Sequence, residues 1–326
     1  MWPQSNRENS RKNLAVRQRL QCKLDRAVLR EIGTPYHVSR PGTLKAPLVL
    51  SSPHSGRHYP KTFQAQSLLS LRQLRQSEDC YIDQLLTPLA KFGIPVLSAK
   101  FPRIYVDVNR TANEWPAYTI SDEQAISDEQ ALLEGISGQA PTITQRARLG
   151  FGVVPTRLGP HTDIYPHNIS ADLIRRRLKV LYHPYHDVLQ ELLHTTKNRF
   201  GHAVLLDCHS MPGSDLSGAK RADIVLGNRH GHACRPETIA FLQTVFTALG
   251  YSVAQNHPYA GGYITAHYGR PNMNIEAVQI EINKDLYLNP LTLERHNGWG
   301  NLAENMQTAI LQIGEYFTTS GAVAAQ

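Results

Sequence analysis

Three segments of this sequence each bring a polar side chain to a buried apolar strand or to its end. The run APLVLSS leads into His54, and the run HAVLL leads, two residues later, into His209. A third strand pattern, AVQIEIN, carries Glu281 between two isoleucines. In an open α/β sheet, ligands bind beyond the carboxyl ends of the strands. We therefore expect the two histidines and the carboxylate to belong to one site.

Strand and helix patterns alternate along the chain. Such alternation is typical of strands that are joined by covering helices. The expected strands are residues 46–52, 94–99, 103–108, 202–206, 223–226, 251–255 and 277–282. The expected helices are residues 68–92, 170–195 with a kink at Pro184, 236–249 and 302–317. The pattern predicts a three-layer α/β fold with a largely parallel sheet.

The start of the chain is polar and basic. Eight lysine or arginine residues fall within the first 30 positions, and a second basic cluster covers residues 175–179. We interpret both clusters as solvated surface, with weak attraction to an anionic partner as the alternative. We predict a loosely ordered basic extension over residues 1–40 and a single domain over residues 41–326. The duplicated acidic stretch ISDEQA, residues 120–131, is interpreted as a surface loop or a slipped insertion.

Several sequence features limit the cellular setting. Four scattered cysteines without C-x-x-C spacing favour a reducing compartment over a disulfide framework or a cysteine-based zinc cluster. The N-terminus has no apolar signal segment, and no run approaches the ~20 apolar residues of a membrane span. No RNA-binding or zinc-finger motif is present, so no nucleic-acid partner is expected. These features predict a cytoplasmic protein with no membrane partner, and they leave its oligomeric state open.

His54, His209 and an acidic pair are candidate metal ligands. Asp79 and Asp83 are four residues apart on the next predicted helix, so they would share one face. Catalytic zinc is commonly held by three protein ligands drawn from His, Asp and Glu, with water in the fourth position. The alternative is that one histidine is a hydrogen-bonded turn residue and both aspartates are solvated. Two histidines at strand ends with a carboxylate on a third strand favour the metal site.

The remaining candidates concern catalysis and substrate binding. Glu281 faces away from its isoleucine neighbours, so it could act as the base for a metal-activated water; a solvent-facing carboxylate on an edge strand is the alternative. Asn109 and Arg110 follow the predicted strand at residues 103–108, which Arg103 begins. Because a guanidinium binds carboxylates through two parallel hydrogen bonds, this pair could hold an anionic substrate. A surface salt bridge is the alternative.

Motifs of several common enzyme classes are absent. The chain has no G-x-G-x-x-G after a strand, no G-x-x-x-x-G-K-[ST], no H-E-x-x-H and no G-x-S-x-G. The usual signals of nucleotide-binding proteins and of serine hydrolases are therefore missing.

Taken together, the polar segments resemble the N-formylglutamate amidohydrolase family. They fall in order across about residues 46–290, and the sequences concerned are PHSGRHYP, EDCYIDQL, RIYVDVNR, HPYH, AVLLDCHSMP, DIVLGNR, AGGYITAHYGRP and VQIEINKDLYL. This family is related in fold to zinc carboxypeptidases and aspartoacylases. The resemblance therefore implies a zinc-carboxypeptidase-like fold, in which a mixed sheet lies between helical layers. It also implies one Zn²⁺ per chain, with another divalent metal as the alternative.

The resemblance assigns roles to the candidate ligands. It implies that His54 and His209 bind zinc. The carboxypeptidase pattern places a glutamate three residues after the first histidine, but Arg57 stands there. The family's acidic pair corresponds to Asp79 and Asp83, and the resemblance favours Asp79 as the acidic ligand, with Asp83 as a ligand or a neighbouring partner.

The resemblance also assigns catalytic roles. Glu281 is the implied general acid and base, and Arg103 stabilises the oxyanion. Asn109 and Arg110 are similar to the Asn-Arg pair that binds the substrate carboxylate in related enzymes. Two departures from the family pattern bear on the substrate. Asn228 stands where Asp is expected, and Ala266 stands where some members carry Arg.

These inferences predict a zinc-dependent amidohydrolase that acts on an N-acyl amino acid. The leading candidate reaction converts N-formyl-L-glutamate to formate and L-glutamate. One alternative is a deacylase for another acyl group, and a second is a non-catalytic binding protein on the same fold. A third is a cysteine hydrolase that uses Cys208 beside His209, which is disfavoured because adjacent strand residues point to opposite faces.

Overall fold

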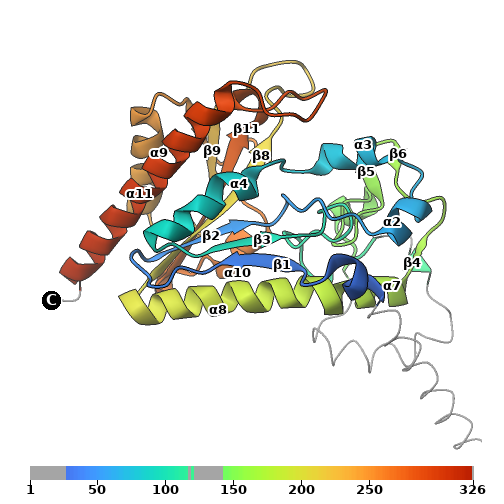
Figure 1. Cartoon of the computed structure of the whole chain (residues 1–326), viewed down its shortest axis with the longest axis horizontal. Coiled ribbons are helices and arrows are strands. Elements are labelled where there is room, and N and C mark those ends of the chain that lie inside the picture. The colour runs from blue at the N-terminus through green and yellow to red at the C-terminus, as the bar shows by residue number, and fades with distance from the viewer. Residues whose placement is uncertain (1–26, 117–118, 121–141, 325–326) are drawn as a thin grey trace, which may run out of the picture.

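A seven-stranded mixed sheet forms the centre of the protein (Figure 1). The computed structural model describes residues 27–116, 119–120 and 142–324. In spatial order the strands are β1 (Tyr36–Ser39), β3 (Val96–Ala99), β2 (Leu48–Ser52), β8 (Ala203–Met211), β11 (Ile275–Asn283), β9 (Ile224–Gly227) and β10 (Val253–Gln255). The pairs β2–β3, β2–β8, β8–β11 and β9–β10 are parallel, whereas β1–β3 and β9–β11 are antiparallel. The predicted α/β fold with a mixed, largely parallel sheet is confirmed.

Helices cover both faces of this sheet. The long helix α8 lies along one face, and α4, α9 and α11 lie on the other (Figure 1). The helices are α2 (Lys61–Gln66), α3 (Leu71–Leu74), α4 (Ile82–Leu86), α6 (Gln145–Arg148), α7 (Ala171–Arg177), α8 (His183–Phe200), α9 (Pro236–Ala248), α10 (Tyr263–Tyr268) and α11 (Gly298–Ala324). A separate hydrophobic cluster fills the space on each side of the sheet. Among the described helices, none is long and apolar enough to cross a membrane.

Short elements complete the described structure. Two small sheets pair β4 (Thr119–Ile120) with β7 (Ile169–Ser170) and β5 (Arg157–Gly159) with β6 (Thr162–Asp163). Four 3₁₀ segments are η1 (Arg75–Ser77), η2 (Thr87–Phe92), η4 (Pro271–Met273) and η5 (Lys284–Leu286). The basic residues 1–26, Cys22 and nearly all of the duplicated ISDEQA stretch lie outside the described residues.

The face of the sheet toward α8 changes from apolar to polar along its central strands. Side chains alternate between faces along a strand, so Ala203 and Leu205 of β8 pack in the α8 cluster while Val204 and Leu206 pack in the other. Farther along the same face of β8, the next two side chains are the polar Asp207 and His209. On the neighbouring strand β11, the corresponding polar side chains are Gln279 and Glu281. The strand register places Gln279 beside Asp207 and Glu281 beside His209. The sheet itself therefore assembles a polar row at the carboxyl ends of its strands.

Two boundaries differ from the sequence prediction. The predicted loose extension over residues 1–40 includes β1, which pairs with β3 at the edge of the sheet. The ordered fold therefore begins before residue 41. The predicted helix at residues 170–195 extends from Ala171 to Phe200, and its irregularity is a π-helical segment at Leu178–Tyr182. Pro184, which lacks a backbone donor, follows directly at the start of α8.

The predicted strand at residues 103–108 is wrong, because this segment is a series of turns. Its residues 104–109 are all buried, so the apolar alternation reflects burial on every side and not a pleated sheet. Its carbonyl groups bind side chains of the helix that crosses the face. Arg177 donates to the Tyr105 carbonyl at 3.1 Å. Two more carbonyl groups accept hydrogen bonds from the same helical stretch. Tyr182 donates to the Arg110 carbonyl at 2.8 Å, and His186 donates to the Val108 carbonyl at 3.0 Å.

Candidate metal centre and active site

Three ligand atoms converge at the ends of β2 and β8. Nδ1 of His54 lies 3.0 Å from Nδ1 of His209, and Oδ2 of Asp79 lies 3.4 Å and 3.1 Å from these two atoms. All three residues are buried, and they form a group that could hold a metal ion. The structure therefore brings together the two histidines and one of the two aspartates that the sequence suggested.

Each histidine is oriented by a second carboxylate. Nε2 of His54 lies 2.8 Å from Oδ1 of Asp107, and Nε2 of His209 lies 2.9 Å from Oδ2 of Asp207. An ionised carboxylate only accepts hydrogen bonds, so in the neutral rings both Nε2 atoms carry the proton and both Nδ1 atoms present lone pairs. Metal-binding histidines are commonly oriented by carboxylates in this way.

This donor set fits a divalent cation such as zinc. Two imidazole lone pairs and a carboxylate oxygen face one another at 3.0–3.4 Å, which is unfavourable unless positive charge lies between them. Tetrahedral zinc with bonds of about 2.0 Å separates its ligands by about 3.3 Å. Burial alone would lower the pKa of His209, but Asp207 and Asp79 raise it well above its ordinary value. The cluster therefore favours a bound positive charge.

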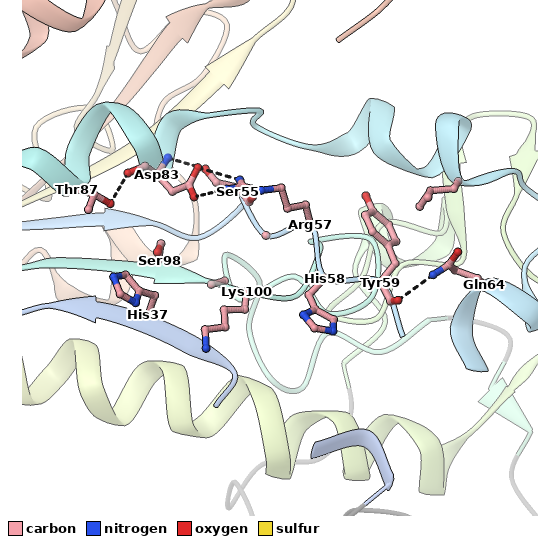
Figure 2. Close-up of a pocket in the computed structure, with 13 residues that line it drawn as sticks. His37, Ser55, Arg57, His58, Tyr59, Gln64, Asp83, Thr87, Ser98 and Lys100 are labelled. Carbon is pink, nitrogen blue, oxygen red and sulfur yellow. Dashed lines mark hydrogen bonds and ion pairs between the residues drawn. The ribbon is translucent and has the colours of Figure 1, made fainter. Parts of the chain in front are cut away.

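Asp83 lies apart from this cluster. The predicted helix over residues 68–92 is interrupted by a turn in which Tyr81 adopts a φ of 66°. Asp79 therefore precedes α4 while Asp83 is inside it, and the expected common face does not form. The Asp83 carboxylate is bound by both terminal nitrogens of Arg57 at 3.2 Å, in a separate cavity of about 510 Å³ (Figure 2). The structure selects Asp79 as the acidic member.

Glu281 occupies the position of a buried base beside the cluster. It is adjacent to His209 across β8 and β11, and its Oε1 accepts a hydrogen bond from Gln279 at 2.8 Å. Burial raises the pKa of Glu281. The nearby His209 partly offsets this increase, whereas the negative charge of Asp79 adds to it. A carboxylate whose pKa is shifted toward neutrality can both accept and return a proton.

A cavity of about 690 Å³ opens over these residues. Asp79, His209 and Glu281 line it, together with Arg103, Arg110, Arg157, Lys284, Tyr259 and neighbouring residues. Arg103 lies in this wall, where its Nη2 donates to Asp107 at 2.8 Å. The cavity thus joins the candidate base, the candidate metal-binding cluster and several cations in one space.

Arg110 is a partly buried cation, and part of its guanidinium lacks a close partner. Its Nε has no hydrogen-bond partner, and the nearest approach to the Asp107 carboxylate is 3.9 Å. Burial lowers the pKa of Arg110, although Asp107 works in the opposite direction. A guanidinium in this state gains from an added anion, because an ion pair would compensate its desolvation.

Asn109, which was predicted to bind substrate, is not among the residues that line the cavity. Its Oδ1 accepts a hydrogen bond from the backbone of Ile264 at 2.8 Å, and its Nδ2 donates to Gln279 at 3.4 Å. A side chain at Gly262 would overlap the Asn109 amide, with the added carbon 2.4 Å away. The amide group is thus used within the protein, where it supports the side chain that orients Glu281.

Two orienting residues were not assigned from the sequence. Asp107 lies within the predicted strand at residues 103–108, and Asp207 lies two residues before His209. A usable signal existed for Asp207, because residues two apart on a strand share a face. No comparable signal marks Asp107, because its place depends on turns that the sequence pattern misrepresented. Ser210 adds a further contact, donating to Oδ1 of Asp79 at 3.0 Å.

The cysteine-hydrolase alternative is not supported. Cys208 packs in the apolar cluster on the opposite face of the sheet from His209. Burial raises the pKa of its thiol well above the ordinary value, and the charge of Asp207 adds to the effect. A buried neutral thiol that faces away from the cavity cannot serve as its nucleophile.

Comparison with known proteins supports the resemblance seen in the sequence. A family model described as N-formylglutamate amidohydrolase matches residues 46–288. The chain belongs to this family. It is 30% identical over 247 residues to an N-formylglutamate deformylase of Pseudomonas aeruginosa, covering 75% of this chain and 83% of the relative. It is 27% identical over 286 residues to one of Pseudomonas putida, covering 85% and 94%.

A solved structure gives the same result. The crystal structure of N-formylglutamate amidohydrolase from Ralstonia eutropha JMP134 superposes with a TM-score of 0.77 at 32% identity, covering 88% of this chain and 99% of that one. The protein is therefore a hydrolase of the amidohydrolase type. The relationship to zinc carboxypeptidases that the sequence suggested stays a prediction.

Proposed function

We propose that this protein is a zinc-dependent enzyme that hydrolyses N-formyl-L-glutamate to formate and L-glutamate. The family membership supports the amidohydrolase chemistry, and the names of the relatives support the substrate. The single observation that carries the metal dependence is the convergence of His54, His209 and Asp79 within 3.0–3.4 Å of one another.

Zinc held by these three residues would polarise the formyl carbonyl and lower the pKa of water toward ~7. Glu281 accepts the proton of the attacking water and later delivers it to the nitrogen of the leaving amine. The C–N bond breaks as that nitrogen is protonated, releasing formate and the free amino acid. Its raised pKa suits Glu281 to this double task.

Two arginines complete the proposed mechanism. Arg103 keeps its positive charge in the cavity wall, because although burial lowers its pKa, Asp107 and Asp79 raise it above the ordinary value. We assign it to stabilise the negative charge that develops on the carbonyl oxygen. Arg110 binds the α-carboxylate of the substrate, which supplies the anion that its guanidinium lacks.

The decisive experiment compares metal-depleted protein with the same protein after zinc is restored. Both forms are assayed for release of the free amino acid from N-formyl-L-glutamate, N-acetyl-L-glutamate and N-formyl-L-glutamine. We expect activity only after zinc is restored, with N-formyl-L-glutamate the best substrate. Faster turnover of the acetyl compound would replace the formyl assignment, and equal activity without metal would refute the zinc dependence.

A further inference from the structure

The active-site cavity is lined by a further cation, Lys284, to which the proposed mechanism gives no role. Lys284 lines the cavity directly after β11 and is half-buried there. Its Nζ donates to the backbone carbonyl of Glu78 at 2.8 Å. No salt bridge to Lys284 is found among the residues that the structure describes. Because an ammonium carries three donors, two remain for a ligand.

The other basic residues of the cavity are differently placed. Arg103 is bound to Asp107 at 2.8 Å, and Arg157 is bound to Asp163 at 2.8 Å. Arg110 and Lys284 are thus the two cations in the cavity lining that lack a close carboxylate partner among the described residues. A ligand with two negative groups would give each of these cations an anionic partner.

These two cations come from different segments of the chain, each anchored by its own contacts. Arg110 follows the turn of Asp107, whose backbone nitrogen is bound to the Val153 carbonyl. Lys284 donates a hydrogen bond to the backbone carbonyl of Glu78, the residue directly before the proposed metal ligand Asp79. The base Glu281 precedes Lys284 by three residues on the same chain segment. A dicarboxylate could therefore be held at two points while its amide reaches the cluster.

We propose that Lys284 binds the side-chain carboxylate of the substrate and makes the site selective for N-acyl amino acids with a second carboxylate. This inference rests on the proposed function, in which Arg110 holds the α-carboxylate. Lys284 is then a specificity-determining residue, and the neutral N-formyl-L-glutamine lacks the anion that it binds.

The test measures a specificity ratio, kcat/KM for N-formyl-L-glutamate divided by that for N-formyl-L-glutamine. We expect Lys284→Met, which keeps the length of the side chain but not its charge, to lower this ratio by about tenfold or more. Lys284→Arg should keep most of it. Lys100→Met is the matched control, because Lys100 lines the separate cavity shown in Figure 2, and its ratio should not change.

A binding measurement separates this proposal from the proposed reaction. In a Glu281→Gln background, calorimetry with N-formyl-L-glutamate and N-formyl-L-glutamine should show the same loss of discrimination when Lys284 becomes Met. An unchanged ratio, in turnover or in binding, would overturn the role of Lys284. Loss of discrimination on Arg157→Gln in place of Lys284→Met would also overturn it. Absence of hydrolysis by the zinc-loaded wild type would refute the proposed function, while the binding ratio would still judge Lys284.

Discussion

Replacing Asp107 by Asn should weaken zinc binding without removing a proposed zinc ligand. The Asp107 carboxylate receives hydrogen bonds from Nε2 of His54 at 2.8 Å, from the Asn109 backbone at 2.9 Å and from Arg103 at 2.8 Å. The partners on both oxygens are donors. In either orientation of an asparagine, its NH₂ group therefore faces at least one N–H and loses that hydrogen bond.

The size of the effect follows from this geometry. If the NH₂ group faces His54, the ring loses the acceptor that fixes its proton on Nε2 and directs Nδ1 toward the metal. If it faces Arg103, a cation loses its charge-assisted partner. Loss of such an orienting carboxylate typically reduces metal affinity about 10- to 100-fold. That range corresponds to roughly 1.4–2.7 kcal/mol of binding free energy.

The assay is competition for zinc between the protein and a chromophoric chelator of known affinity. Asp83→Asn is the matched control, because it also removes a carboxylate from an arginine but lies in the other cavity. We expect its zinc affinity to equal that of the wild type. Folding of both variants is checked by circular dichroism. A folded Asp107→Asn protein with wild-type zinc affinity would refute the claim that Asp107 orients His54 for metal binding.

Three further predictions address catalysis, substrate binding and stability. Glu281→Gln should retain zinc, measured by metal analysis, but lower kcat by ~10²-fold or more, the usual scale for loss of a general base; unimpaired turnover would assign the proton transfer elsewhere. Arg110→Ala should reduce kcat/KM by about 10- to 150-fold, from about 1.5–3 kcal/mol for a charge-assisted pair, and the wild type should hydrolyse the α-carboxamide of the substrate poorly; equal rates on acid and amide would contradict carboxylate recognition. Burial lowers the pKa of His186 to about 3, whereas an unfolded histidine titrates near 6.5, so the unfolded chain binds the extra proton and stability falls as the pH drops below about 6.5. This effect should reach about 2 kcal/mol at pH 5, and urea unfolding at pH 5 and 7 should show a smaller pH dependence for His186→Gln.

The sheet and its polar strand ends were accessible from the sequence because they follow short-range rules. Buried strands read as apolar runs, and alternation places Glu281 opposite its isoleucine neighbours. The convergence of His54 and His209 then follows from the general position of ligand sites in α/β sheets. Family resemblance added roles to these positions, and the match over residues 46–288 confirmed the family itself.

The errors arose where a local pattern depended on tertiary structure. Residues 103–108 alternate like a strand, but side chains of Arg177 and His186 take the carbonyls that a neighbouring strand would need. Asp79 and Asp83 have helical spacing, but the turn at Tyr81 separates them. Gly56, two residues after His54, shows another such dependence: it admits the backbone of Phe101, whose oxygen would lie 2.0 Å from an added side-chain carbon.

Side chains of the continuous helical stretch at residues 171–200 hold residues 105–110 in place, which has a consequence for ligand entry. Ordering a mobile residue costs roughly 1–2 kcal/mol of conformational entropy, and here that cost falls on folding and not on substrate binding. The segment with Arg110 should therefore have the same conformation before and after the substrate arrives. Association would then be limited by diffusion and desolvation, without a slow closing step. Because these hydrogen bonds tie the segment to the helix, the cavity should keep its shape until the helix itself unfolds. Loss of activity on heating and global unfolding should therefore occur at the same temperature.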